Sequence, residues 1–267
     1  MPPLTQSRTP NLLHLLLFSG LTVAGLFCAE VGLALMHPHN VIAAFSDQRL
    51  QIYANIGTYL IALGLSALVF PLVWQRSFAK GISWNPRAPL LRLIPFGIAL
   101  GYASQAASSL LPIPKDTPME KIFETPGIIW VLAIFGTLIA PLFEEIVFRG
   151  FLLPGIAIAV DYLRLPRSLD ALTQWRLGAD TPDSYSPPAL AISTIVTSLL
   201  FGLIHAYQLG YTWSAVALLS CVSLVLCVVR LRTHSVAASF AVHASYNFSV
   251  FVTLFVSTGG FRHMEKL

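Results

Sequence analysis

Seven long apolar stretches divide this chain of 267 residues and leave little sequence between them. They fall at about 12–36, 51–74, 90–111, 127–158, 189–207, 212–230 and 235–257. Each is close to or longer than the roughly 20 residues that an α-helix needs to cross about 30 Å of hydrocarbon. Since none shows the period-two alternation of a barrel strand, we predict an all-α polytopic transmembrane helical bundle with about seven spans (six to eight).

The composition excludes a soluble domain. Hydrophobic residues make up 55% of the chain and charged residues 10%, with a mean hydropathy of +0.72. We therefore expect an integral membrane protein with membrane lipid around it, in a bacterial cytoplasmic (inner) membrane. Basic loops facing anionic lipid explain the net charge of +4, so no nucleic-acid partner is expected. No internal repeat is present, and residues 1–267 are predicted to form a single membrane domain.

Lysine and arginine predict the orientation of the spans. If the seven spans alternate, ten basic residues lie on the amino-terminal side and five on the other, with Arg149 left out as intramembrane. The positive-inside rule then places the amino terminus in the cytoplasm. The longest polar connection, 161–188, becomes a cytoplasmic loop. Leu169, Leu172 and Trp175 recur within it at three-residue steps, which suits either an interfacial helix or a plain surface loop.

Three charged residues interrupt the fourth apolar stretch: Glu144, Glu145 and Arg149. A charge in the hydrocarbon costs several kcal/mol at its centre, so such residues are candidates for a functional site. Residues four apart share a helix face, whereas adjacent residues point about 100° apart. Glu145 and Arg149 can therefore pair, which leaves Glu144 free to react. The alternative is that both glutamates only hold helices together.

Two further spans each carry a histidine with a second side chain four residues away, on the same helix face. Phe201 lies one turn before His205 and can pack beside its imidazole. His243 and Asn247, also four residues apart, direct an imidazole and a carboxamide to one region. Each group taken alone is typical of interhelical hydrogen bonding.

Together these groups indicate hydrolysis of an amide. Glu144, His205, His243 and Asn247 supply a general base, a proton shuttle and hydrogen-bond donors for an oxyanion. Glu144, His205 and His243 would also suit a zinc ion with one open position, although the chain has no His-Glu-x-x-His motif.

The three motifs Glu144-Glu-Ile-Val-Phe-Arg149, Phe201-Gly-Leu-Ile-His205 and His243-Ala-Ser-Tyr-Asn247 resemble those of the CAAX-prenyl-endopeptidase and bacteriocin-processing (CPBP/Abi) family. The resemblance implies a catalytic core over about 125–257 and an intramembrane endopeptidase that cleaves near the membrane-embedded end of a peptide or protein, prenylated or not. Glu144 and His205 would activate water, while His243 and Asn247 would stabilise the oxyanion. Glu145, Arg149 and Phe201 would support them. The family is often labelled metalloprotease, but we favour a reaction without a metal cofactor, with zinc as the alternative.

Two other functions stay open on the sequence alone. One is a catalytically silent membrane scaffold or immunity factor, and the other is an ion-coupled transporter, which would be expected to show duplicated halves that the sequence lacks. Glu30 in the first span and Asn55 in the second could face one another or the cavity, and we expect structural pairing and not catalysis. The sequence does not identify the substrate.

Overall fold

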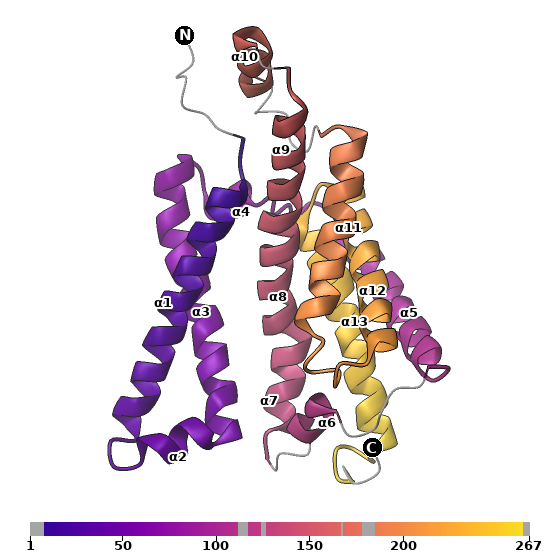
Figure 1. Ribbon diagram of the computed structural model, residues 1–267. Helices are drawn as coiled ribbons and strands as arrows, with labels where there is room; N and C mark the ends of the chain where they lie inside the picture. Colours follow the sequence, from indigo (N-terminus) through magenta and orange to yellow (C-terminus); the bar gives the residue numbers. More distant parts are fainter. Residues whose placement is uncertain (1–7, 112–116, 124–126, 167, 178–184, 264–267) are drawn as a thin grey trace.

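In a computed structural model the protein is a bundle of helices (Figure 1). The structure describes residues 8–111, 117–123, 127–166, 168–177 and 185–263, and no strand occurs in these ranges. The helices are α1 (Leu12–Met36), α2 (Val41–Ser46), α3 (Gln48–Trp74), α4 (Phe78–Gly81), α5 (Leu90–Ser108), α6 (Pro118–Phe123), α7 (Ile129–Ile134), α8 (Ala140–Glu145), α9 (Leu153–Arg164), α10 (Leu169–Leu177), α11 (Pro187–Ile204), α12 (Trp213–Thr233) and α13 (Val236–Ser257). Two π-helical segments, η1 (Phe135–Ile139) and η2 (Ile146–Leu152), join α7, α8 and α9 into one rod.

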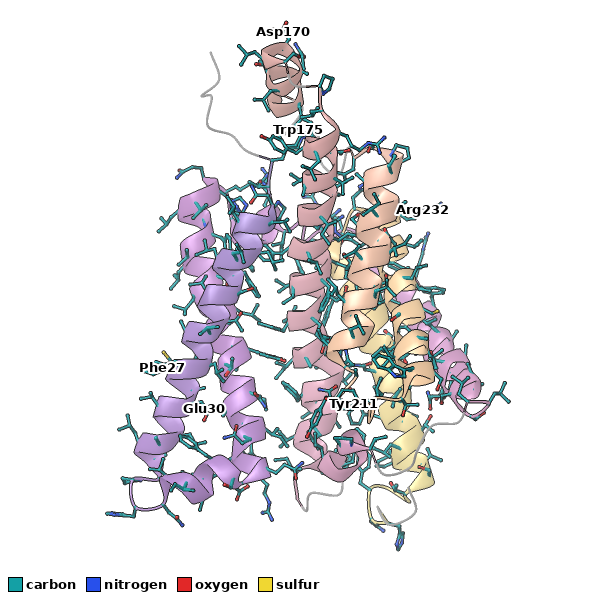
Figure 2. The ribbon with its side chains drawn as sticks, in the orientation of Figure 1. Phe27, Glu30, Asp170, Trp175, Tyr211 and Arg232 are labelled. Carbon is teal, nitrogen blue, oxygen red and sulfur yellow. The ribbon has the colours of Figure 1, made fainter. Side chains whose placement is uncertain are left out.

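Seven helical runs are long and apolar enough to cross a membrane, which confirms the predicted all-α polytopic class. The fourth run differs most from its predicted bounds, because it extends over Ile129–Arg164, 36 residues. The expected loop at 161–188 therefore begins later, and its residues 167 and 178–184 lie outside the described part of the chain. Leu169–Leu177 within it form helix α10, beyond the end of α9 (Figure 2).

The long α7–α9 rod stands between two groups of helices. Figure 1 shows the hairpin of α1 and α3 on one side of the rod, with α11, α12, α13 and α5 on the other. Within the second group α5 packs along α13, and α11 packs on both α12 and α9. The rod is therefore the element that both groups share.

A buried aromatic cluster attaches the hairpin to the rod. Phe18 of α1 and Phe70 of α3 meet Phe151 of η2, with ring centroids 4.9 Å and 5.1 Å from that of Phe151. All three side chains are almost completely buried. Aromatic rings bury a large apolar area in a defined geometry, so this cluster fixes where α3 lies relative to η2.

The predicted pairing of Glu30 with Asn55 is wrong. Glu30 is half-buried on α1 (Figure 2) and Asn55 is exposed on α3, and neither forms a hydrogen bond with a described residue. The two helices instead meet through small residues such as Gly25, whose hydrogen faces the Thr58 carbonyl. Close approach at those small residues, and not a polar contact, holds the hairpin.

Candidate active site

The two π-helical segments flank the short helix that carries the glutamates. Glu144 and Glu145 are the last residues of α8 and η2 begins at the next residue, Ile146. π-Helical turns are rare and are frequently found at functional sites. Each inserts an extra residue into the helix and so changes which side chains share a face. Pro141 lies in the first turn of α8, and η1 immediately precedes that helix.

Pro141 explains one feature of η1. The Ala140 N–H donates to the carbonyl of Phe135, five residues back, as a π-helix requires. The next donor in that register would be residue 141, but proline has no N–H. The Gly136 carbonyl accepts instead from Asn247 Nδ2 of α13, at 2.7 Å. A side chain thus replaces the missing backbone donor, and this bond fixes the Asn247 carboxamide.

The predicted pair of Glu145 and Arg149 is confirmed. Arg149 Nη1 lies 2.9 Å from Glu145 Oε1, and both side chains are fully buried. Arg149 Nη2 also donates to Ser223 of α12, at 2.7 Å to its hydroxyl and 2.9 Å to its carbonyl. The pair therefore ties the rod to α12 and leaves no exposed charge.

Glu145 has a second partner, which the sequence did not predict. His243 Nδ1 of α13 lies 2.9 Å from Glu145 Oε1, the oxygen that also accepts from Arg149. A carboxylate accepts hydrogen bonds and does not donate them, so Nδ1 carries the proton. His243 Nε2 then faces Glu144 Oε2 at 3.8 Å. Glu145 thus fixes the orientation of His243 as well as that of Arg149.

His205 approaches Glu144 from α11. It is the first residue after that helix, and its Nδ1 lies 2.7 Å from the carbonyl of Phe201. The carbonyl accepts from Nδ1, which places Nε2 3.8 Å from Glu144 Oε1. The Phe201 ring packs beside the imidazole, with centroids 4.8 Å apart, as predicted, and also lies 4.9 Å from the Arg149 guanidinium carbon.

The Glu144 carboxylate is consequently held between two imidazoles. Each of its oxygens lies 3.8 Å from the Nε2 atom of a different histidine. A water molecule beside such a pair can lie about 2.8 Å from both atoms. The side chains of Glu144 and His205 are 18% and 16% exposed, whereas Glu145 is fully buried. Glu144, which was predicted to react, is therefore accessible to solvent, and Glu145, which was predicted to be structural, is not.

A zinc ion would need a tighter grouping. Zinc ligands lie about 2.0–2.2 Å from the ion. In the described ranges no three His, Cys, Asp or Glu side chains are grouped as metal ligands. The Nε2 atoms of His205 and His243 lie nearest to different oxygens of Glu144. Glu145 Oε1 already accepts hydrogen bonds from Arg149 and His243. The described residues thus show no grouped set of zinc ligands, and we derive no step through a metal.

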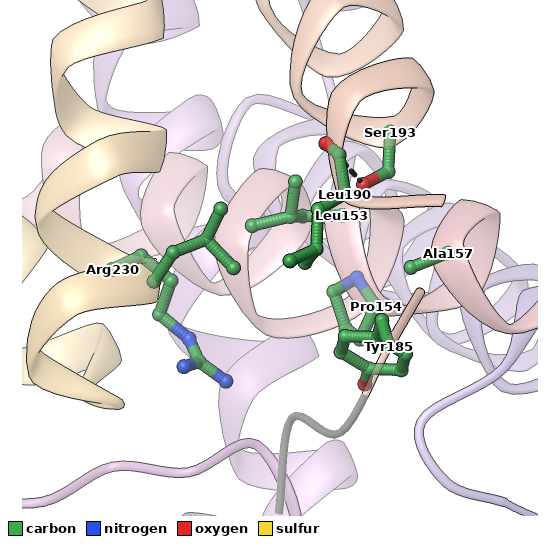
Figure 3. Close-up of a pocket in the computed structure, with 8 residues that line it drawn as sticks. Leu153, Pro154, Ala157, Tyr185, Leu190, Ser193 and Arg230 are labelled. Atoms are coloured by element: carbon green, nitrogen blue, oxygen red, sulfur yellow. Dashed lines mark hydrogen bonds between the residues drawn. The ribbon is translucent and has the colours of Figure 1, made fainter. Parts of the chain in front are cut away.

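The structure also has a pocket away from these groups, between α9, α11 and α12 (Figure 3). Pro154, Ser193 and Arg230 line it, and none of the predicted site residues does. Within α11, the Ser193 hydroxyl in this lining donates to the Leu190 carbonyl, as Figure 3 shows. The candidate site is therefore defined by its convergent titratable groups and not by this pocket.

Sequence reasoning missed two contributors. Ser223 is one of several small polar residues in the apolar α12, and nothing in its spacing marks it as the partner of Arg149. Gly136 acts through its carbonyl, which no side-chain pattern reveals. The signal available for Gly136 was Pro141, whose missing donor leaves a carbonyl to be satisfied.

Residues 126–249 match the family described as type II CAAX prenyl endopeptidase Rce1-like. The matched segment is a little under half of the chain and contains all three motifs. No curated protein and no solved structure matched the chain. The family match confirms the resemblance inferred from the three motifs and supports, in general terms, a CAAX-type intramembrane endopeptidase.

Proposed function

We propose that the protein hydrolyses a peptide bond near the membrane-embedded end of a protein or peptide substrate, with water activated by Glu144 and His205. The observation that carries this proposal is the placement of the Glu144 carboxylate 3.8 Å from the Nε2 atoms of both His205 and His243. A carboxylate beside water and an imidazole is a general base within reach of the proton that it removes. The partial exposure of Glu144 and His205 lets water and substrate reach them.

The reaction proceeds in two steps on these residues. Glu144 takes a proton from water as the water oxygen attacks the scissile carbonyl, and His205 holds that water. The tetrahedral intermediate places a negative charge on the former carbonyl oxygen. Glu144 then returns the proton to the leaving amine, and the carbon–nitrogen bond breaks. Base and acid are the same carboxyl group, so atoms and protons balance over one turnover.

His243 and Asn247 are the proposed donors to the oxyanion. His243 would donate from Nε2, which faces Glu144 Oε2 at 3.8 Å, while Glu145 holds its Nδ1 at 2.9 Å. Asn247 uses one amide hydrogen on the Gly136 carbonyl and keeps the other for the oxyanion. Donors that are already oriented stabilise developing charge without reorganisation, and loss of one such donor costs roughly 100-fold or more in rate.

The test replaces the carboxylate without changing its shape. Purified Glu144→Gln should lose more than about 1000-fold of the cleavage rate on a membrane peptide while its thermal unfolding in detergent stays within a few degrees of the parent, because Gln cannot accept the proton. Glu30→Gln is the matched control, since it makes the same change in another membrane span outside the site. Prenylated and unprenylated forms of the peptide show whether the lipid is required.

Glu145→Gln should behave differently from Glu144→Gln. It leaves the buried Arg149 charge without its carboxylate, and breaking a buried pair on one side costs about 3–5 kcal/mol of stability. A lower unfolding temperature is expected for this variant and not for Glu144→Gln. Full turnover by Glu144→Gln would contradict the assignment and favour the scaffold alternative.

A further inference from the structure

Tyr59 of α3 reaches the site from the helical hairpin, outside the segment that matches the family. Its ring lies on that of Phe143, with centroids 4.0 Å apart and planes 3° apart. A second stacked contact, at 5.7 Å, joins it to Phe135 of η1. Phe143 is the residue immediately before Glu144, so the stack places the phenol beside the end of α8 that carries the proposed base.

The side of approach is also informative. His205 and His243 come from α11 and α13, while α3 lies on the other side of the rod (Figure 1). Tyr59 therefore reaches the rod from the side opposite the helices that carry the two imidazoles. The Glu144 carboxylate is near enough to the phenol to interact with it electrostatically.

The Tyr59 hydroxyl has no structural task that would explain its presence in a membrane span. The side chain is half-buried, and its hydroxyl forms no hydrogen bond with any described residue. A phenol in an apolar setting normally finds a partner for its O–H. Phenylalanine would make the same two stacked contacts, so packing alone does not call for a hydroxyl.

We propose that Tyr59 is a further substrate-contacting residue of the site, whose O–H donates a hydrogen bond to a carbonyl of the peptide bound at Glu144. This inference rests on the proposed peptidase function. It assigns to the α1–α3 hairpin the second wall of the substrate site, opposite α11 and α13. The contact lets a hairpin outside the matched segment help to orient the peptide for attack.

The test is Tyr59→Phe, which keeps the ring and its stacking on Phe143 and removes one hydroxyl. We expect kcat/KM for the membrane peptide to fall about tenfold or more with the unfolding temperature unchanged. Tyr53→Phe is the matched control, because Tyr53 lies on the same helix, is exposed and makes no ring contact with the rod. Binding of uncleaved peptide is measured in the Glu144→Gln background with and without Tyr59→Phe.

The outcomes separate clearly. A raised Kd in the Glu144→Gln background assigns the contact to the bound substrate, and a lowered kcat with unchanged Kd assigns it to the transition state; both support the proposal. Parental kcat/KM and Kd for Tyr59→Phe overturn it, even where Glu144→Gln is inactive and the peptidase function holds. If Glu144→Gln retains full turnover, the function itself fails, independently of Tyr59.

Discussion

Glu144 and Glu145 are neighbours in the sequence, yet their surroundings differ sharply. Glu145 is fully buried and its Oε1 accepts from both Arg149 and His243. Glu144 is partly exposed and faces two imidazole nitrogens, each at 3.8 Å. The pattern resembles a catalytic triad in one respect, since a buried carboxylate sets which histidine nitrogen carries the proton. Helical spacing predicted the pairing with Arg149, but only the approach of α13 made Glu145 an orienting group for His243.

Whether Glu144 and His205 activate water without a metal ion can be tested directly. If Glu144 and His205 activate water by themselves, exhaustive dialysis against a chelator should leave the cleavage rate unchanged, and elemental analysis should find well under one zinc per chain. The matched control is a zinc peptidase treated in the same way. Loss of activity on chelation, with recovery when zinc is added back, would instead assign Glu144, His205 and His243 to a metal shell that must close around the ion.

At the scale of elements, close contact between α11 and α12 positions His205. A methyl group at Gly202 would lie 2.7 Å from the Val216 carbonyl and 2.1 Å from the Ser220 hydroxyl. Gly202 is one turn before His205, whose N–H donates to the Gly202 carbonyl at 3.1 Å. The absence of a side chain at Gly202 is therefore what lets the end of α11 lie against α12.

Gly202→Ala should consequently lower both stability and cleavage. Overpacking at a close helix contact costs about 1–3 kcal/mol, and the displaced turn moves His205 relative to Glu144. Thermal unfolding and cleavage rate are measured together. Gly64→Ala is the control, because nothing lies within 4 Å of the position its methyl would take and alanine is the better helix former. If Gly202→Ala keeps the parental unfolding temperature and cleavage rate, α12 accommodates the added methyl group, and the close contact at Gly202 is not what positions His205.

For the whole molecule, the seven runs place the start of α1 and the end of α13 at opposite ends of the bundle (Figure 1). The positive-inside rule predicts that the end near α4 faces the cytoplasm. Arg87 follows α4, and His39 lies between α1 and α2 at the other end; both are exposed. In a chain without Cys28, Cys221 and Cys227, an impermeant maleimide added to intact cells should label His39→Cys, and should label Arg87→Cys only after permeabilisation. The reverse pattern would contradict the predicted orientation.

The sequence by itself determined the class, the spans and the candidate residues. Runs of about 20 apolar residues have one stable solution in lipid, a helix that satisfies its own backbone, so the seven spans follow from local composition. The pair of Glu145 and Arg149 follows for the same reason, because residues four apart on one helix meet whatever surrounds them. Even Phe201 beside His205 needed only helical spacing.

Contacts between spans were decided by the tertiary structure. The bonds from Glu145 to His243, from Arg149 to Ser223 and from Asn247 to the Gly136 carbonyl each join residues at least 74 positions apart in the chain. Helical periodicity gives the face on which a side chain lies but not which helix packs against that face. How the helices pack also decides the depth of each span, the π-helical turns around α8 and the approach of Tyr59. The local sequence of one helix does not specify which other helix packs against it.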